Sequence, residues 1–199
     1  QVGEREARKA IDDLELSLDI AGVNTSSQTV LSGDISEIKR VAQYFQGEGY
    51  KVRELDVSHA FHSSHMDAML EAFSRVAEDC TFHPPQIPLV SNVTGVMATE
   101  DELMSPGYWV RHVREAVLFD SGIATLADLG VDAFVECGPR GVLCAMGAAS
   151  LEGGDHLFVP SLRGGQSEVE SVSRALAQVH VAGFDVDWMS VVGSLPGAR

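Results

Sequence analysis

The chain has 199 residues, of which 45% are hydrophobic and 22% are charged, a composition typical of a globular protein and not of a disordered one. Its formal charge of −15 argues against nucleic-acid binding, which needs a basic surface, and against binding to anionic membranes. No apolar run approaches the roughly 20 residues of a membrane-spanning helix, and the charged N-terminus does not have the pattern of a signal peptide. The 3 cysteines form no C-x-x-C pair and lie in apolar contexts, which predicts reduced, buried thiols in a cytoplasmic protein.

The first quarter of the chain predicts a small unit of helices and strands. Apolar residues recur at helical spacing over residues 4–14 and again over residues 35–45. Strands are predicted from alternating or short apolar runs at residues 17–23, 29–31 and 50–57. The order helix, strand, strand, helix, strand is that of a ferredoxin-like β-α-β-β-α-β unit without its first strand. We therefore expect that strand to lie upstream of residue 1, in a longer polypeptide.

The rest of the chain alternates strands, loops and helices, which is typical of a parallel α/β protein. Helices are predicted from apolar periodicity at residues 66–76, 106–113, 122–129, 143–149 and 169–181. Short strands are predicted at residues 89–90 and 132–135. From residue 151 onward the glycine content rises, which predicts a linker that packs on the domain.

Histidines are concentrated in one short segment, which reads H-A-F-H-S-S-H from His59 to His65. A metal site is one interpretation, but the spacing does not match H-E-x-x-H and no Cys or Glu ligand lies nearby in the sequence. Histidines without a function are a second interpretation, which the position between a predicted strand and a predicted helix makes less favourable. A general base is the third, since an imidazole titrates near neutrality and can take a proton from a hydroxyl group.

The sequence offers such a base no convincing nucleophile. A G-x-S-x-G turn is absent, because the only two glycines with that spacing have Leu195 between them. The serines of the histidine segment are too close in sequence to act as partners, and no strand–serine–helix turn frames them. Cys137 and Cys144 lie between apolar residues, which favours buried thiols over nucleophiles.

Four motifs occur in an order that resembles the acyltransferase domain of modular polyketide synthases. In chain order they read VSHAFHS, PPQIPLVSNVTG, YWVRHVREAVLF and FVECGPRGVL. The chain is similar, more distantly, to malonyl-CoA:acyl carrier protein transacylases. The resemblance covers about residues 1–150, and the remaining residues resemble the linker that follows such domains.

This resemblance implies the fold class and the division of the chain. We expect an α/β protein with a ferredoxin-like small subdomain over residues 1–57. The C-terminal part of an α/β-hydrolase-like acyltransferase core would cover residues 58–150. A post-acyltransferase linker would cover residues 151–199.

The resemblance also implies a reaction. A Ser–His dyad would transfer a malonyl unit from coenzyme A to the phosphopantetheine thiol of an acyl carrier protein, within a multifunctional synthase of secondary metabolites. The catalytic histidine of the family is the last residue of the motif that reads HAFH here, which assigns His62 as the base. In the family a main-chain carbonyl of the S-N-V-T-G run holds the other ring nitrogen, which assigns Asn92, although a plain Asx turn accounts for Asn92 equally well.

Selectivity is implied by the same motif. In the family, HAFH accompanies malonyl units, and a tyrosine–alanine–serine–histidine version accompanies methylmalonyl units. His59, Ala60 and Phe61 are therefore candidate selectivity residues. The Phe61 ring would fill the space that an α-methyl group needs, and one methyl group is worth roughly 10- to 200-fold in such a pocket. A plain core aromatic is a compatible interpretation of Phe61.

The chain also departs from the family pattern. The run after His62 is S-S-H-M where the family usually has S-P-L-M. The serine elbow and the arginine that pairs with the malonyl carboxylate are both expected upstream of residue 1. The alternative is therefore a catalytically degenerate or docking module, which binds a carrier protein or neighbouring domains without acyl transfer.

The partners that the resemblance implies are an acyl carrier protein, the ketosynthase and other domains of the same synthase, and the upstream part of the same domain. Malonyl-CoA and the phosphopantetheinylated carrier would be substrates, and neither a bound cofactor nor a metal is expected. Candidate contacts for the carrier protein or for a coenzyme A phosphate are the basic residues of the small subdomain, Lys39, Arg40, Lys51 and Arg53. A merely solvated basic face is the competing interpretation.

Overall fold

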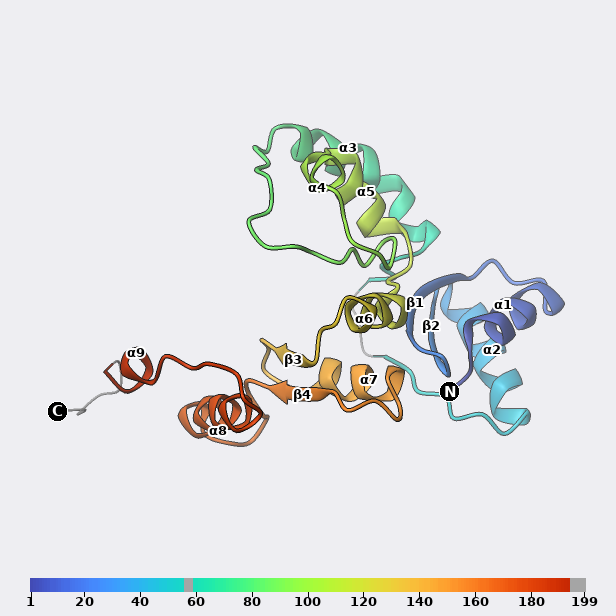
Figure 1. Ribbon diagram of the computed structural model, residues 1–199. Helices are drawn as coiled ribbons and strands as arrows, with labels where there is room; N and C mark the ends of the chain where they lie inside the picture. Colours follow the sequence, from blue (N-terminus) through green and yellow to red (C-terminus); the bar gives the residue numbers. More distant parts are fainter. Residues whose placement is uncertain (56–58, 194–199) are drawn as a thin grey trace. The chain divides into compact units, whose positions relative to one another are not determined.

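The computed structural model describes residues 1–55 and 59–193. The chain divides into two compact units, residues 1–130 and residues 131–199, and each is described by itself (Figure 1). The predicted segment boundaries at 57/58 and 150/151 fall inside these units, and they stay predictions.

The first unit begins with two helices and a β-hairpin. Helix α1 (Glu4–Asp13) precedes strands β1 (Asp19–Thr25) and β2 (Gln28–Ser32), and helix α2 (Ile35–Gly47) follows them. The two strands pair antiparallel across a two-residue turn. Asp34 caps α2 by accepting a hydrogen bond from the Ser36 amide, which satisfies one of the free amides at the helix start. The predicted order of helix, strand, strand, helix is confirmed.

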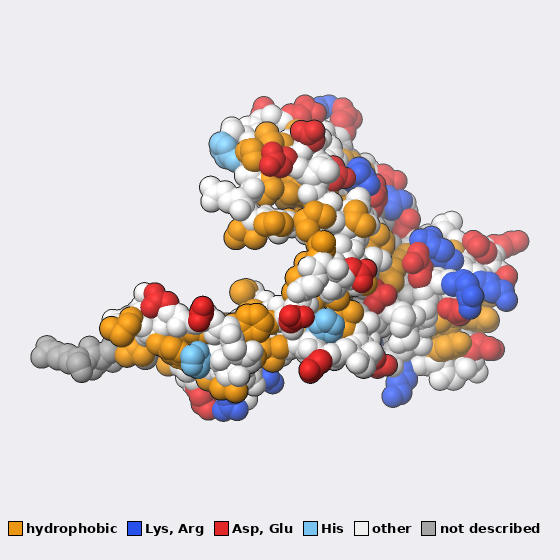
Figure 2. Space-filling view, viewed as in Figure 1, with side chains coloured by type: hydrophobic (Ala, Val, Ile, Leu, Met, Phe, Trp, Pro, Cys, Tyr) orange, Lys and Arg blue, Asp and Glu red, His pale blue; other side chains and the backbone are white. Residues whose placement is uncertain are grey.

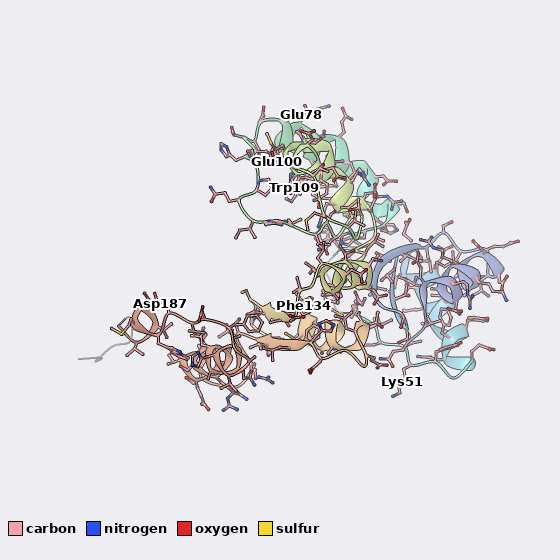
Figure 3. The ribbon with its side chains drawn as sticks, viewed as in Figure 1. Lys51, Glu78, Glu100, Trp109, Phe134 and Asp187 are labelled. Atoms are coloured by element: carbon pink, nitrogen blue, oxygen red, sulfur yellow. The ribbon has the colours of Figure 1, made fainter. Side chains whose placement is uncertain are left out.

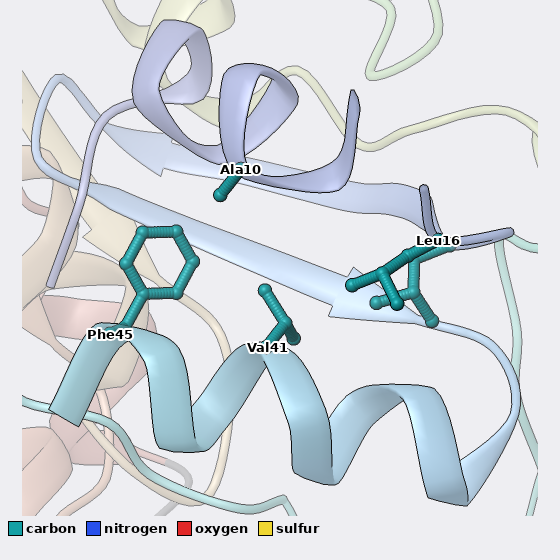
Figure 4. Close-up of a cluster of buried hydrophobic side chains, with 5 residues drawn as sticks. Ala10, Leu16, Val41 and Phe45 are labelled. Carbon is teal, nitrogen blue, oxygen red and sulfur yellow. The ribbon is translucent and has the colours of Figure 1, made fainter. Parts of the chain in front are cut away.

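The core of this part lies where α1 and α2 meet β1. Its members are apolar side chains at helical or alternating spacing that are at most 8% exposed: Ala10, Leu16, Leu18, Val41 and Phe45 (Figure 4). The small Ala10 side chain brings the backbone of α1 close to the facing side chains. Burial of this apolar surface holds both helices against one face of the hairpin (Figure 1).

The strand predicted over residues 50–57 is not present in the described part of that range. Residues 50–55 have no regular structure, and residues 56–57 lie outside the described residues. A strand forms only beside a hydrogen-bonding neighbour. Among the described residues, β2 pairs with β1, and the other side of β1 is occupied at Gly22 by Val117.

The second half of the first unit is helical. A single 3₁₀ turn (Ser64–Met66) leads into α3 (Asp67–Glu78), and α4 (Glu100–Met104), α5 (Pro106–Arg114) and α6 (Phe119–Asp128) follow. Helix α3 packs on α5, and α6 packs beside β1 (Figure 1). The short helix α4 was not predicted, although Thr99 and Glu102 form a capping box at its start. The strand predicted at residues 89–90 is wrong, because only one bridge, Val90 to Met97, forms there.

Backbone pairing joins the segment after α5 to the hairpin. The Val23 amide donates to the Val117 carbonyl at 2.8 Å, and the Val117 amide donates to the Ala21 carbonyl at 2.9 Å. Gly22 lies opposite Val117 in this pairing. This pairing fixes the position of the chain immediately after α5.

The second unit contains a parallel β-α-β arrangement. Strand β3 (Ala133–Glu136) pairs in parallel with β4 (Leu157–Pro160), and α7 (Val142–Ser150) connects them (Figure 1). Val159 on β4 is completely buried. Helices α8 (Glu168–Val181) and α9 (Trp188–Gly193) follow. The predicted strand at 132–135 and the predicted helices at 143–149 and 169–181 are confirmed within a residue or two, whereas β4 and α9 were missed.

The prediction of buried thiols is wrong for two of the three cysteines. Cys80 and Cys137 are exposed, and only Cys144 is buried. Cys80 lies just past the end of α3, next to Asp79, and Cys137 lies in the loop after β3, next to Glu136, so both are in connecting segments outside the core. None of the described helices combines the length and the apolar character that crossing a membrane requires.

The core around α2 allows a stability test. Phe45→Ala should lower the free energy of unfolding of the first unit by about 3–5 kcal/mol, because it removes a buried ring and leaves a cavity. Gln43→Ala, on the same helix and at an exposed position, should change it by less than about 0.5 kcal/mol. Urea denaturation followed by circular dichroism measures both, and equal midpoints for the two variants would contradict the assignment of the core.

Candidate active site

His62 lies in a tightly held loop between the segment that ends at residue 61 and the 3₁₀ turn. Its backbone has a φ of 58°, in the left-handed region that non-glycine residues rarely adopt. The next residue, Ser63, is completely buried, and its hydroxyl donates to the Ala60 carbonyl at 2.6 Å. The Ser63 hydroxyl oxygen also accepts from the His65 amide at 3.3 Å. These contacts hold the loop in the shape that the unusual backbone angle requires.

The ring of His62 is oriented by the main chain at the end of α5. Its Nδ1 lies 2.7 Å from the carbonyl oxygen of Glu115, and its amide donates to the carbonyl oxygen of Val113 at 3.2 Å. A carbonyl oxygen can only accept, so Nδ1 carries the hydrogen when the ring is neutral. The Nε2 lone pair is then free to take a proton, and Nε2 has no hydrogen-bond partner among residues 1–55 and 59–193.

The assignment of Asn92 as the residue that orients His62 is corrected by this contact. The Asn92 carbonyl accepts instead from the Leu118 amide at 2.8 Å, three residues beyond Glu115. Asn92 therefore helps to position the segment after α5 and does not touch the ring. The Glu115 side chain is not involved either, since it pairs with Arg111 at 2.7 Å. No sequence signal could have identified Glu115, because every residue carries a backbone carbonyl.

A second histidine, His112 on α5, lies near His62. The two ring centroids are 6.4 Å apart, and His112 also packs against Tyr108 and Trp109 of the same helix. Burial lowers the pKa of His112 below its usual value, and the nearby His62 lowers it further. The lowered pKa favours the neutral form of His112 beside His62. His112 was not predicted from the sequence.

The selectivity candidates lie directly before His62. Phe61 is 51% exposed, so the interpretation as a core aromatic does not describe it within this chain. Its ring lies 5.8 Å from that of His59, centroid to centroid. The two rings form an exposed aromatic pair beside the candidate base, and Ala60 between them contributes its carbonyl to Ser63.

The four basic candidates lie elsewhere on the first unit. Lys39 and Arg40 are exposed on α2, and Lys51 and Arg53 are exposed in the stretch that follows it, where Lys51 points outward (Figure 3). Arg40 donates to the Leu14 carbonyl at 3.3 Å. Figure 2 shows acidic and basic side chains interspersed over the neighbouring helix α1, so the visible surface there is not uniformly basic.

Other candidate sites contain fewer side chains that could bind a metal ion or catalyse a reaction. Within the described part of the chain, no three His, Cys, Asp or Glu side chains gather as they would to hold a metal ion. A cavity of about 420 Å³ in the second unit is lined mainly by apolar residues of α8, of α9 and of the chain between them. Val172, Leu176 and Val191 are examples. It contains neither a histidine nor a cysteine. The histidine loop is therefore the site with catalytic potential.

A histidine that is oriented through Nδ1 has the geometry that a general base requires. The chain belongs to the acyl transferase domain family, which matches residues 2–186. This match confirms the resemblance drawn from the sequence motifs. It also places the histidine loop in a chain of that family.

The similar proteins are polyketide synthases and their acyltransferase domains. Polyketide synthase GfsA of Streptomyces halstedii is 45% identical over 192 residues, which are 94% of this chain and 3% of the synthase. PKS-NRPS hybrid synthetase acdB of Aspergillus candidus is 42% identical over 187 residues, 92% of this chain and 8% of the synthetase. The chain thus spans a small fraction of the synthases that it matches.

Solved structures confirm the predicted α/β acyltransferase fold. The acyltransferase domain from the second module of the salinomycin polyketide synthase superimposes with a TM-score of 0.88 at 42% identity, covering 98% of this chain and 48% of that one. The acyl transferase domain of SpnD, solved in complex with 2-(pent-4-yn-1-yl)malonyl, gives a TM-score of 0.84 at 32% identity, covering 89% and 44%. The chain therefore spans about half the length of these domains.

The orientation of His62 can be tested on the chain directly. We expect the neutral ring to carry its hydrogen on Nδ1, because the Glu115 carbonyl accepts from that atom. Long-range ¹H–¹⁵N spectra of the ¹⁵N-histidine-labelled protein distinguish the two ring nitrogens, with the exposed His83 as an internal reference. A hydrogen on Nε2 of His62 would contradict the described geometry.

Proposed function

We propose that the chain is part of an acyltransferase that moves a malonyl unit from coenzyme A to the phosphopantetheine thiol of an acyl carrier protein, with His62 as the general base of a Ser–His dyad. The observation that carries this proposal is the hydrogen bond between His62 Nδ1 and the Glu115 carbonyl, which leaves Nε2 as the proton acceptor. Membership of the acyl transferase domain family supports it.

The proposed chemistry has two symmetrical halves. In the first, His62 Nε2 takes the serine hydroxyl proton while the oxygen attacks the thioester carbonyl, and the leaving thiolate of coenzyme A takes that proton back. In the second, Nε2 takes the proton of the carrier thiol while its sulfur attacks the acyl-serine ester, and the serine oxygen recovers the proton. One imidazole thus acts as base and then as acid in each half.

The serine of this dyad is not among the 199 residues as a G-x-S-x-G turn. The chain covers 48% of the salinomycin acyltransferase domain, so such a domain contains about as many residues again. We therefore propose that residues outside this sequence supply the nucleophile and the group that pairs with the malonyl carboxylate. The alternative is a module that binds a carrier protein without transferring an acyl group. In that case the assembled domain would contain no such serine.

Malonyl selectivity is proposed from the residues beside the base. Phe61 immediately precedes His62, and its half-exposed ring is available to contact an acyl group held on the serine beside His62. A similar domain, that of SpnD, was solved with a substituted malonyl group, which supports a malonyl-type substrate class here. Because Phe61 is large, the proposal favours the unsubstituted malonyl unit.

The proposed partners follow from this chemistry. An acyl carrier protein must bring its thiol to His62, and the ketosynthase and other domains of a synthase would surround the acyltransferase, as the polyketide synthase relatives suggest. The exposed Lys39, Arg40, Lys51 and Arg53 are proposed contacts for an acidic carrier surface or a coenzyme A phosphate. A cytoplasmic location is proposed because both substrates occur there.

The role of His62 is tested in the acyltransferase domain that contains these residues and its serine. His62→Ala should slow transfer from radiolabelled malonyl-CoA to the carrier protein by about 10²- to 10⁴-fold, the usual contribution of a positioned base. His65→Ala is the matched control, because His65 is an exposed imidazole in the same loop and should leave transfer near the parental rate. Equal rates for both variants would exclude His62 as the base.

The role of Phe61 is tested by competition between two donors in the same domain. Phe61→Ser should shift the ratio of kcat/KM toward methylmalonyl-CoA by about 10- to 200-fold, because the smaller side chain leaves room for the α-methyl group. Phe82→Ser, which removes a ring that stacks on Trp109, is the control for loss of an aromatic side chain. An unchanged ratio in Phe61→Ser would count against the steric explanation.

A further inference from the structure

Arg114 lies between the two residues whose carbonyls hold His62. Val113 accepts from the His62 amide, and Glu115 accepts from the His62 ring. Arg114 is also the last residue of α5, where the helix ends and the chain turns toward β1. Any shift of the backbone at Arg114 therefore moves both acceptors of His62 together.

The side chain of Arg114 is tied to two other segments of the first unit. Its Nη1 and Nη2 each donate to Oδ1 of Asp19, at the start of β1, at 3.1 Å. Its Nε donates to Oδ1 of Asp67, the first residue of α3, at 2.7 Å. One guanidinium thus links the end of α5 to a strand and to a second helix. Its five donors, spread in one plane, suit contacts with two carboxylates in different directions.

Asp19 closes this network back onto the histidine loop. Its second oxygen, Oδ2, accepts from the amide of Ser64 at 2.8 Å. Ser64 follows His62 by two residues, across the completely buried Ser63. A continuous path of hydrogen bonds therefore runs from His62 through the end of α5, the Arg114 side chain and the Asp19 carboxylate, and returns to the histidine loop.

The network bears on the position of His62 as well as on the stability of the fold. The Arg114 and Asp19 side chains are 30% and 28% exposed, so water screens their ion pair only in part. His62 has a backbone angle that is not its own preference, so the contacts on both sides of it must hold it in place. Loss of the network should therefore disturb the geometry of the histidine loop.

We propose that Arg114 is a positioning residue for the general base, which it keeps aligned by locking the end of α5 to the histidine loop through Asp19 and Asp67. This inference rests on the proposed function of His62 as the base. Arg114 does not need to touch a substrate in this role. Its effect is to fix the distance and direction between His62 Nε2 and the reacting hydroxyl, where displacements near 1 Å cost about 10²-fold in rate.

Arg114→Gln tests the proposal in the acyltransferase domain. We expect kcat for transfer from malonyl-CoA to fall about 10- to 100-fold while KM stays near the parental value, because alignment and not binding is lost. Arg114→Lys should recover only part of kcat, since a single ammonium nitrogen lacks the planar, spread donors with which the guanidinium contacts Asp19 and Asp67. Arg75→Gln removes an equal charge from an ion pair within α3 and should leave kcat unchanged.

A spectroscopic measurement on the chain separates this proposal from the proposed function. In Arg114→Gln, the ¹⁵N shifts of the two His62 ring nitrogens should move toward each other as the Nδ1 bond to the Glu115 carbonyl loosens, and Arg75→Gln should leave them in place. If His62→Ala remains fully active, the proposed function fails, while these shifts still decide the positioning role. A folded Arg114→Gln variant with parental kcat and parental shifts overturns the proposal.

If Arg114→Gln does not fold, Asp19→Asn tests the same positioning role of the network. An amide has one acceptor oxygen, so it can satisfy either Arg114 or the Ser64 amide but not both. We expect a smaller fall in kcat than in Arg114→Gln, with the same movement of the His62 shifts. Parental values of both quantities in Asp19→Asn overturn the proposal as well.

Discussion

The hydrogen bond from His62 Nδ1 to the Glu115 carbonyl is the interaction on which the site depends. It selects one tautomer, because the acceptor has no hydrogen to give, and it therefore decides which ring nitrogen is left with a lone pair. The backbone at His62 occupies a region that costs about 1–3 kcal/mol for a non-glycine residue. The buried Ser63 and the Val113 carbonyl hold the loop in that conformation.

A main-chain acceptor has consequences that a carboxylate would not have. The Glu115 carbonyl does not titrate, so the orientation of the ring does not change as a neighbouring acid is protonated. A neutral carbonyl also orients the ring without placing a negative charge beside it. Burial lowers the pKa of the nearby His112, which favours its neutral form.

Periodicity in the sequence predicted most helices correctly, because buried faces such as that of Val41 and Phe45 repeat at 3.6 residues. It failed where a short element depends on its partner: β4 forms only because β3 lies beside it, and the strand expected at 50–57 is absent over its described residues. His62 was found from a local motif. Its orienting carbonyl was assigned to Asn92, 23 residues too early, because backbone acceptors leave no mark in a sequence. The pairing of Arg114 with Asp19 spans 95 residues, and its register is set by tertiary packing alone.

The central claim is that His62 Nε2 receives its proton from a serine hydroxyl outside these 199 residues. The most direct measurement is a crystal structure of the longer polypeptide that contains both groups. The account predicts a serine oxygen, on a strand-to-helix turn, about 2.6–3.2 Å from His62 Nε2. An Nε2 atom bonded to another group of the protein, with no hydroxyl in reach, would contradict it.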